Sequence, residues 1–559
     1  MCTPLALLAC AWRPPLRGQP RFAARPAQPQ QPPTGGDAAG YDLWWRSDAT
    51  EVVTPMRLKV DGALPKWLRG SLVRVGPGSF EVGRQQLQHQ IDGLAKLTKY
   101  RVDGDGVHFQ SRMLQSHLYN RTQLAAPPSS PWALWTEPAL VTMLPVEPTY
   151  TPCQRVRALL EEPVTDNTNI FIGSTGGAVH ASSDTSVASN TFDLETLAST
   201  GHLKVEMEAP RRTADTVTGA HKQRVVNGSA TVGWVGRVEV RQDKLSLSST
   251  VVSVYRDDPL PEAAPAAGGG AAARRRFLGQ LRIRLSEHGL PMIHSFQVTE
   301  RHLIGSKLFV LMEPFAGVET LGWRGEQETT VYVMDLESTS PTAGPVRTFV
   351  TDPMYMNHHI NAWESDGGRK DGSFLSNPRG FGNLEAAVPH DEWPLPAAAA
   401  SRQPGGCEEL HVEMPRFNDR RHGAPYRRHG APYRFVYSVG SPDSAATHVS
   451  GIVKVDLGPP PAAEPADFGP PSTAPPEPAA ARCVSWYRTA HYPSEPVFVP
   501  RPGATAEDDG VVLSVMLDGE ARASYLLVLN ATTMRTMATA YSPVVMPADF
   551  HGEWFGEDI

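Results

Sequence analysis

Short runs in which apolar and polar residues alternate recur along the chain, and helical periodicity is scarce. The clearest example is Tyr100–Phe109, where two alternating runs flank the Asp-Gly pairs of residues 103–106. Glycine adopts the positive φ that a tight hairpin turn requires, so this stretch predicts two antiparallel strands. Further β-rich runs predict strands at Ser71–Val75, Lys307–Met312, Thr330–Met334, Phe435–Val439, Val511–Met516 and Tyr525–Leu529.

A weak internal repeat accompanies these runs. A strand ends in Asp or Asn, and an apolar or small residue and often Thr or Ser follow. The pattern occurs at Asp193, Asp335, Asp456 and Asn530. Repeated strand-to-turn units over several hundred residues favour an all-β propeller, while the irregular spacing leaves a pair of large β-sandwiches as the alternative.

The N-terminus differs in composition from the rest. The first 36 residues contain no acidic residue and four arginines, with many Pro, Ala and Gln. Because no basic segment precedes the apolar stretch, this is typical of an organelle transit peptide rather than a secretory signal, and a disordered tail is the alternative. We therefore expect a tail over residues 1–40 and a single domain over 41–559. If the tail is a transit peptide, we expect the protein in a plastid or another organelle. If it is a disordered tail, we expect the protein in the cytoplasm.

Charge and cysteine usage exclude several classes. The formal net charge is -7 and the body of the chain has no long basic run, so nucleic acid is not an expected partner. The five cysteines lie far apart and form no C-x-x-C pair. This argues against a disulfide framework or a zinc-thiolate site and favours a reducing compartment. No apolar run approaches the roughly 20 residues that cross a bilayer.

Four of the 18 histidines lie in partly apolar, strand-rich surroundings. They are spread over more than half of the chain, unlike the paired histidines of a helical metal site. The innermost strands of a propeller converge on one axis, so each blade can contribute one inward side chain to a shared metal. These candidate ligands are His221, His294, His358 and His551.

Several motifs, in order along the chain, identify a family. They are Leu64–Leu72, Gly76–Gly83, Ile91–Gly93, Thr165–Asn167, Tyr492–Val499 and Glu507–Val515. The chain closely resembles the carotenoid cleavage oxygenases, most of all their animal-type branch, from about residue 52 to residue 559. The resemblance implies an all-β, seven-bladed β-propeller with a helical cap over the iron-bearing face. It also implies Fe(II) on the axis, held by the four histidines.

The third and first ligand positions differ in how well they match the family's motifs. The family's third ligand stands three residues before the Asn of an Asn-Ala pair, here Asn361, which selects His358 and leaves His359 as a neighbour. At the first position Lys222 follows His221, where the family has proline and then a second histidine. The ligand is retained, but the loop after it is expected to differ in shape.

The resemblance also implies carboxylates behind the ligands. Four neutral imidazoles suit Fe(II) and leave two of six octahedral positions for O2 and a substrate or solvent. A carboxylate that accepts the other ring N–H fixes the tautomer of each ligand. The expected pairs are Asp184 with His294, Glu413 with His358 and Glu495 with His551. Asp184 replaces the family's glutamate and is one methylene shorter, so its hydrogen bond could be lost or bridged by water.

The implied activity is O2-dependent cleavage of a polyene C=C bond to aldehydes, with Fe(II) as the only cofactor. Similarity over the whole chain favours central cleavage of β-carotene to retinal. Eccentric cleavage to an apocarotenoid, cleavage of a stilbene-like phenylpropanoid, non-oxidative retinoid isomerohydrolysis and carotenoid binding without turnover remain alternatives. The ligands do not separate them, because all share the same fold.

Two further segments stand out. Trp132–Leu160 is unusually apolar for a connection, and family members carry a membrane-dipping patch near this region. We expect peripheral membrane contact there, with a helix packed on the propeller as the alternative. Residues 420–426 are duplicated at once as 427–433. We interpret this repeat as a surface duplication or a gene-model artefact rather than a site.

Overall fold

The computed structural model describes most of the chain outside its N-terminal tail and several connections. The described residues are 39–124, 142, 146, 165–184, 186–207, 217–225, 229–241, 246–260, 271–284, 290–299, 301–306, 308–310, 329–336, 346–351, 358–364, 370–375, 382–387, 411–418, 433–441, 450–457 and 482–557. The predicted transit peptide, nearly all of Trp132–Leu160 and nearly all of the repeat at 420–433 lie outside them, so those predictions stay open.

Strands dominate the described residues. The first sheet contains, in spatial order, β1 (Val52–Leu58), β7 (Gly106–Met113), β6 (Leu94–Asp103), β3 (Gly70–Ser79) and β36 (Gly552–Gly556). The next contains β11 (Ser199–His202), β10 (Ser186–Phe192), β9 (Ala178–Ser183) and β8 (Phe171–Thr175). A third contains β12 (Val205–Met207), β17 (Ala273–Arg284), β16 (Ser246–Pro259), β15 (Thr231–Arg241) and β13 (Val217–Thr218), and β14 (Gln223–Arg224) also pairs with β15.

The remaining sheets follow in chain order. One contains β23 (Val346–Thr351), β22 (Thr329–Asp335), β20 (His302–Ser306) and β19 (Phe296–Val298). A three-stranded sheet contains β26 (Gly382–Ala387), β25 (Lys370–Leu375) and β24 (His359–Glu364). Another contains β30 (Arg482–Tyr487), β29 (Gly451–Asp456), β28 (Phe435–Ser441) and β27 (His411–Phe417). The last contains β2 (Val60–Gly62), β35 (Thr536–Tyr541), β34 (Ala523–Asn530), β33 (Gly510–Asp518) and β31 (His491–Pro493), and β32 (Val497–Pro500) also pairs with β33.

Two short pairs complete the strands, and helices are few. The pairs are β18 (Leu290–Met292) with β21 (Leu308–Val310), and β4 (Glu81–Val82) with β5 (Gln85–Gln86). The described helices are the 3-10 turns η2 (Tyr41–Trp45) and η3 (Gln90–Asp92) and the α-helix α2 (His117–Gln123). No helix among the described residues is long and apolar enough to span a membrane.

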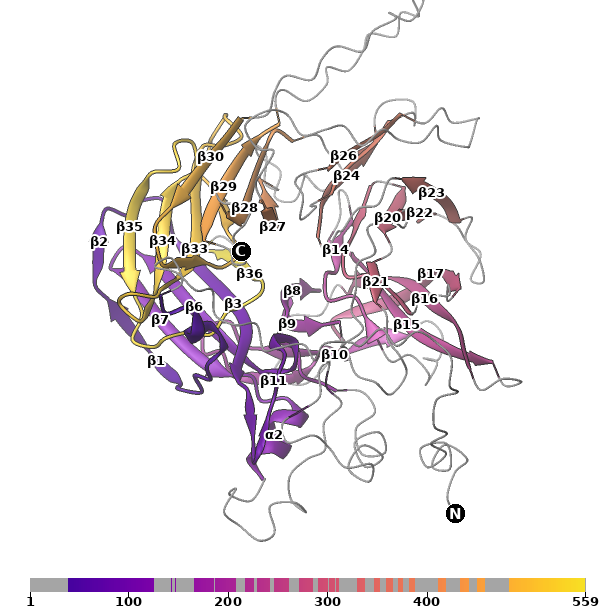
Figure 1. Ribbon diagram of the computed structural model, residues 1–559, viewed down its shortest axis with the longest axis horizontal. Helices are drawn as coiled ribbons and strands as arrows, with labels where there is room; N and C mark the ends of the chain where they lie inside the picture. Colours follow the sequence, from indigo (N-terminus) through magenta and orange to yellow (C-terminus); the bar gives the residue numbers. More distant parts are fainter. Residues whose placement is uncertain are drawn as a thin grey trace, which may run out of the picture.

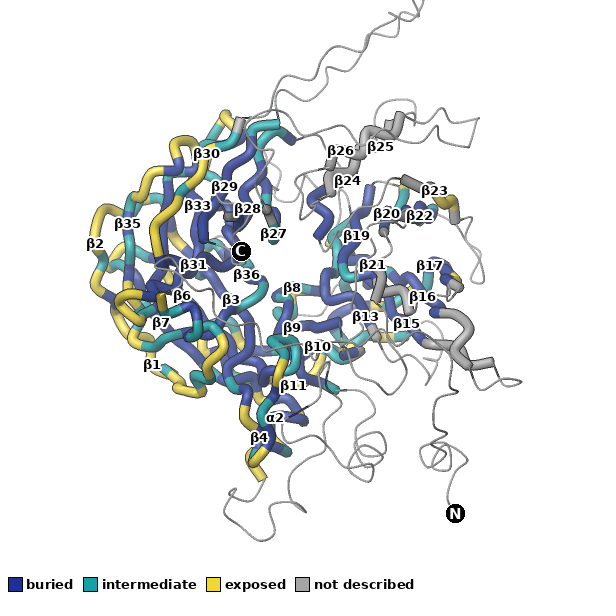
Figure 2. Tube along the Cα trace, in the orientation of Figure 1, coloured by how far each residue is buried: buried dark blue, intermediate teal, exposed yellow. Residues whose placement is uncertain are grey.

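The sheets are arranged around a common axis as a propeller (Figure 1). The innermost strands of neighbouring sheets contact one another around the ring. β36 packs against β8, and β14 packs against β19, which is followed in turn by β24 and β27. β27 then contacts β32, and β32 contacts β36. The all-β propeller is therefore confirmed. Figure 2 shows the inner strands buried and outer strands such as β1 and β2 exposed, as expected when each sheet packs its faces against its neighbours.

The predicted number of complete blades is wrong for the described residues. Six sheets have four or more strands, and the three-stranded sheet β24–β26 lies between two of them. The segment that follows β26, residues 388–410, is outside the described residues. The helical cap stays a prediction. Among the described residues the one α-helix is α2, and Ser116 Oγ at its start accepts a hydrogen bond from the Tyr119 backbone N–H at 3.0 Å.

Both ends of the chain close the ring. The N-terminal strand β3 pairs with the C-terminal strand β36, and β2 pairs with β35. In Figure 1 the indigo and yellow strands accordingly lie side by side. A shared hydrophobic core joins these two sheets, with Leu72 and Tyr100 on one side and Leu513 and Val528 on the other. This double closure fixes the segment just before β36, which carries His551.

The predicted hairpin is confirmed as β6 and β7, where Asp103 pairs with Gly106. Gly106 has a φ of +128°, a conformation that favours glycine. Every other predicted run also contains or overlaps a strand, namely β3, β21, β22, β28, β33 and β34. The alternation of side chains therefore located the strands correctly.

At two of its four positions, Asp193 and Asn530, the weak repeat corresponds to the same turn. Asp193 Oδ1 accepts hydrogen bonds from Thr196 N at 2.8 Å and Thr196 Oγ1 at 2.7 Å. Asn530 Oδ1 accepts the equivalent pair from Thr533 N at 2.8 Å and Thr533 Oγ1 at 3.0 Å. Each turn then places an apolar residue in the left-handed region, Leu197 or Met534. The sequence echo is thus a side-chain-capped turn between neighbouring strands of a sheet.

We expect Asp193→Ala and Asn530→Ala to destabilise the protein equally. Each substitution removes two local hydrogen bonds, which corresponds to about 1 kcal/mol in the free energy of unfolding. Urea unfolding followed by tryptophan fluorescence measures the effect. An unchanged midpoint in both variants would show that the turn forms without its side-chain acceptor.

The expectation about cysteines needs a correction. Cys483, on β30, is disulfide-bonded. The other cysteines, Cys2, Cys10, Cys153 and Cys407, lie outside the described residues. Wide spacing in the sequence does not exclude a bridge, because a propeller brings distant segments together.

Candidate metal centre

The four candidate histidines all lie next to inner strands. His221 stands between β13 and β14, and His294 stands between β18 and β19. His358 immediately precedes β24, and His551 immediately precedes β36. Because these strands surround the axis, segments more than 300 residues apart in sequence deliver their imidazoles to one point.

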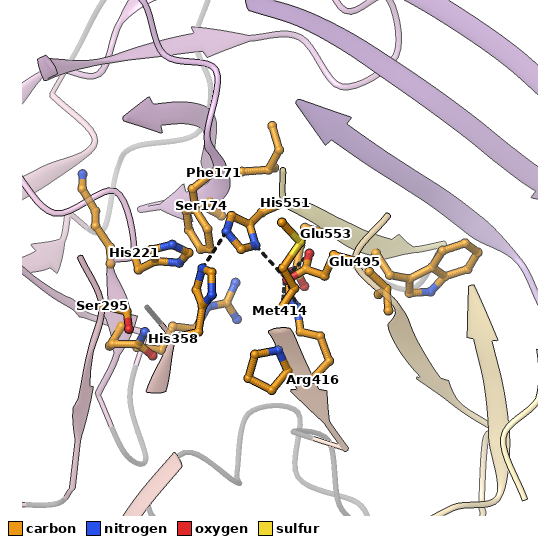
Figure 3. A pocket seen from close by; sticks show the side chains of 18 of the residues that line it. Phe171, Ser174, His221, Ser295, His358, Met414, Arg416, Glu495, His551 and Glu553 are labelled. Carbon is orange, nitrogen blue, oxygen red and sulfur yellow. Dashed lines mark hydrogen bonds and ion pairs between the residues drawn. The ribbon is translucent and has the colours of Figure 1, made fainter. Parts of the chain in front are cut away.

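The imidazole nitrogens converge. The Nε2 atoms of His221 and His294 are 3.3 Å apart, those of His294 and His358 are 3.2 Å apart, and those of His358 and His551 are 3.2 Å apart. The four ligand atoms lie within 4.8 Å of one another, and this group could hold a metal ion. Figure 3 shows the rings of His221, His358 and His551 pointing toward one another.

The donor set fits a metal ion. Nitrogens bound to one ion at about 2.1 Å lie roughly 3.0–3.4 Å from their neighbours, which matches the observed contacts. Where Nδ1 of a ligand carries the proton, its Nε2 presents a lone pair to the shared point. Lone pairs facing one another at 3.2 Å are unfavourable without a cation between them.

A carboxylate stands behind three of the imidazoles. His294 Nδ1 is 2.6 Å from Asp184 Oδ2, His358 Nδ1 is 2.7 Å from Glu413 Oε2, and His551 Nδ1 is 2.8 Å from Glu495 Oε1. These are the expected pairs. A carboxylate that accepts from Nδ1–H selects the tautomer with a free Nε2 and turns the ring toward the centre.

The shorter Asp184 side chain reaches His294 directly, without a bridging water. It stands next to the end of β9, and its second oxygen, Oδ1, accepts a hydrogen bond from the Ala220 backbone N–H at 2.8 Å. Its carbonyl accepts from Thr218 N at 3.3 Å. Asp184 therefore orients His294 and also holds the segment that leads into His221.

A β-bulge positions Glu413. The register of β27 against β28 shifts between Glu413 and Arg416, and Met414 has a φ of +50°. That conformation costs a non-glycine residue about 1–3 kcal/mol, so the surrounding structure must impose it. The Met414 backbone N–H donates to Glu413 Oε2 at 3.1 Å. The bulge thus aims the carboxylate at His358.

Two arginines that the sequence analysis missed organise the site around Glu495. Arg416 donates to both carboxylate oxygens of Glu495, at 2.8 and 3.0 Å, and Glu495 Oε2 also accepts from the Gly552 backbone N–H at 3.0 Å. Arg74 is fully buried and donates to the Glu495 carbonyl at 3.0 Å and to Asp549 Oδ1 at 2.8 Å. The sequence held one signal for these arginines: Arg74 is a charged residue within the otherwise apolar run that forms β3.

Burial and these partners set the charge of the site. Burial lowers the pKa of His551 to about 4, against the opposing Glu495 carboxylate, and burial holds the pKa of His221 well below its usual range. Burial also disfavours charge on His294, but the Asp184 carboxylate outweighs it and raises the pKa of His294. Arg416 and His551 lower the pKa of Glu495 despite its burial. Neutral imidazoles at His221 and His551 are the form that binds a metal.

The loop after His221 is held by the residue that follows this histidine. Lys222 points into a buried cluster, where its Nζ lies 3.9 Å from Asp257 Oδ2. Arg275 binds the same carboxylate with two hydrogen bonds, at 2.7 and 2.8 Å. Burial lowers the pKa of Lys222 to about 8. Lys222 therefore anchors the loop to the third sheet.

Three of the four histidines face a cavity of about 170 Å³. Its wall includes His221, His358 and His551 together with Phe171 and Met414. Figure 3 shows these side chains around the shared point. His359 is buried but does not belong to the metal-binding group, and burial lowers its pKa to about 3.

The family model described as retinal pigment epithelial membrane protein matches residues 45–556. The chain belongs to this family, the carotenoid oxygenases. A carotenoid isomerooxygenase from Galleria mellonella is 27% identical, with coverage of 92% of this chain and 96% of that protein. The β,β-carotene 15,15'-dioxygenase of Homo sapiens is 26% identical, with coverage of 91% and 94%. The structure of a mutant Synechocystis apocarotenoid oxygenase matches with a TM-score of 0.63 at 19% identity, covering 92% of this chain and 98% of that one.

The comparisons confirm the family that the motifs predicted. They extend over nearly the whole described chain, so the carotenoid oxygenase relatives share the propeller and not only a local motif. The solved structure supports the fold alone. The site residues are placed by the geometry above.

Proposed function

We propose that this protein is an iron(II)-dependent carotenoid cleavage dioxygenase. The observation that carries the proposal is the convergence of four imidazole Nε2 atoms, three of them on rings held from behind by carboxylates. The names of the relatives, an isomerooxygenase and a dioxygenase of carotenoids, support the reaction class.

Iron(II) fits the donor set and the reaction class. Imidazole suits iron, copper, nickel and zinc, so the ligands alone do not select one of these metals. When bound, iron(II) would supply the ability to react with O2 that the closed-shell zinc ion lacks. His221, His294, His358 and His551 would hold it, and Asp184, Glu413 and Glu495 would keep the imidazoles in the correct tautomer. Three of the four ligands, His221, His358 and His551, are buried, and His294 is partly buried.

The proposed substrate is a carotenoid, with cleavage at the central double bond of β-carotene. One β-carotene and one O2 then give two molecules of retinal, and each aldehyde retains one atom of the O2. Eccentric cleavage uses the same centre and differs in how far the polyene enters the site. The name of the Galleria relative adds a second candidate, cleavage coupled to isomerisation of a remaining double bond.

Product analysis tests the proposal. Protein stripped of metal and reloaded with Fe(II) is incubated with β-carotene while O2 consumption is recorded. Retinal formed at two molecules per O2 supports central cleavage, and its double-bond geometry distinguishes simple cleavage from cleavage with isomerisation. β-Ionone or a shorter apocarotenal would replace central by eccentric cleavage. Product without O2 consumption, or full activity without iron, would refute the dioxygenase.

Asp184→Asn is expected to weaken metal binding by about 10–100-fold. This is the usual effect of losing the group that hydrogen-bonds to the second ring nitrogen of a metal-binding histidine. The amide cannot supply two anionic oxygens, so it no longer satisfies both His294 Nδ1 and the Ala220 N–H as the carboxylate does. Iron retained during titration with a chelator measures the change. Unaltered retention would show that Asp184 has a structural role alone.

A further inference from the structure

A second cavity lies between two blades beside the metal centre. It has a volume of about 20 Å³ and only apolar atoms face it. Every side chain in its wall is buried. The wall is formed by residues of β15, β16, β17, β20 and β22 and by the segment around β19: Trp234, Val252, Val254, Leu281, Ile293, Phe296, Leu303, Gly305, Tyr332 and Met334.

The wall is continuous with two ligand-bearing segments. Ile293 immediately precedes His294, and Phe296 follows that ligand by two residues. On the opposite side the Trp234 carbonyl accepts hydrogen bonds from Thr218 Oγ1 at 2.6 Å and Gly219 N at 3.3 Å. Gly219 leads directly into His221. The cavity wall therefore includes the residue that precedes His294 and a residue of β15, the strand that pairs with β13 and β14 on either side of His221.

Its size and chemistry select the occupant. A cavity of roughly 10–15 Å³ by this measure holds one water-sized molecule, but water needs two to four polar partners. This wall offers none, so water is disfavoured, whereas apolar cavities stay dry and accept xenon or other apolar guests. O2 is apolar and small, and the proposed reaction consumes it.

We propose that this cavity holds O2 next to the metal centre before it reacts. The inference rests on the proposed dioxygenase function, because an isomerohydrolase or a binding protein would have no use for an O2 site. The cavity raises the local concentration of O2 beside His294, and the KM for O2 thus depends on it. The carotenoid does not enter a space of this size.

Gly305 on β20 gives a clean way to fill the space. A Cβ added there would meet Phe296 Cβ at 3.6 Å, Ile293 Cγ2 at 3.8 Å and Leu303 Cδ2 at 3.9 Å, which are ordinary van der Waals contacts. All three residues belong to the cavity wall. Gly305→Ala therefore introduces a methyl group into the cavity without a clash.

We expect Gly305→Ala to raise the KM for O2 severalfold while the KM for the carotenoid and kcat at saturating O2 stay unchanged. The matched control is Gly556→Ala on β36, where an added Cβ would meet Trp554 Nε1 at 3.8 Å and nothing closer. Xenon binding to the wild type and to Gly305→Ala, measured by ¹²⁹Xe NMR on metal-free protein, reports on the cavity independently of turnover.

Xenon binding that Gly305→Ala removes, together with a raised KM for O2, supports the inference. Absence of xenon binding in the wild type, or a KM for O2 that is unchanged in Gly305→Ala, overturns it. If the iron-loaded wild type cleaves no carotenoid and consumes no O2, the proposed function has failed, and the O2 site falls with it. Normal wild-type turnover with an unaffected Gly305→Ala variant contradicts the O2 site alone.

Discussion

His358→Ala is expected to abolish metal binding and catalysis. His358 Nε2 contacts the Nε2 atoms of both His294 and His551, so its removal opens the middle of the ligand set. The loss also leaves Glu413 without its imidazole partner. Losing a carboxylate behind a ligand typically costs about 10–100-fold, and losing the ligand itself should exceed that range. Iron content after reconstitution and the rate of β-carotene cleavage measure the two effects.

The adjacent histidine provides the matched control. His359 is also buried, but it lies outside the metal-binding group and its backbone N–H donates to Ser295 Oγ at 2.8 Å. His359→Gln should therefore retain iron, since it removes an imidazole from the same segment without touching the ligand set. Iron retained by His358→Ala, or lost equally from His359→Gln, would contradict the assignment of His358.

The sequence predicted the four histidines that converge in the structure, because their motifs are local. Each histidine lies in a short pattern, and the spacing to Asn361 separated His358 from its neighbour. The carboxylates were predicted by resemblance in the same way. The direct contact of the shorter Asp184 was not predictable, because it depends on how closely β9 approaches the segment before β19.

The arginines were missed for a different reason. Arg74 and Asp549 are 475 residues apart, and the sequence around either residue does not indicate that the two pair. Arg416 follows Glu413 by three residues but binds Glu495, which lies between β31 and β32. Such contacts arise only when the ring closes. Strand positions come from local alternation, while the number of complete sheets and the disulfide at Cys483 depend on how distant segments meet.

Ring closure therefore does more than stabilise the propeller. The pairing of β3 with β36 places Arg74 beneath the segment that carries His551. Arg74 then holds the Glu495 carbonyl, and the Glu495 side chain holds His551 Nδ1. One imidazole is thus fixed by both ends of the chain, and the integrity of the metal centre is coupled to closure of the fold.

Arg74→Met is expected to lower the free energy of unfolding by about 3–5 kcal/mol, the cost of breaking a buried ion pair by removing one partner. Asp549 would stay largely buried without its cation, and the carbonyls of Glu495 and Phe550 would lose their donor. Because those carbonyls lie beside His551 and its carboxylate, we also expect weaker iron retention. Thermal unfolding of metal-free protein measures the first effect, and chelator competition measures the second.

The exposed pair of Arg501 and Asp509 is the control. Its side chains are 53% and 29% exposed, so the charges stay solvated when the partner is lost. Arg501→Met should therefore change the free energy of unfolding by about 0–1 kcal/mol and leave iron retention unaltered. Equal destabilisation by the two substitutions would show that burial of Arg74 does not decide its effect. Strong destabilisation by Arg74→Met with unaltered iron retention would separate ring closure from the metal centre.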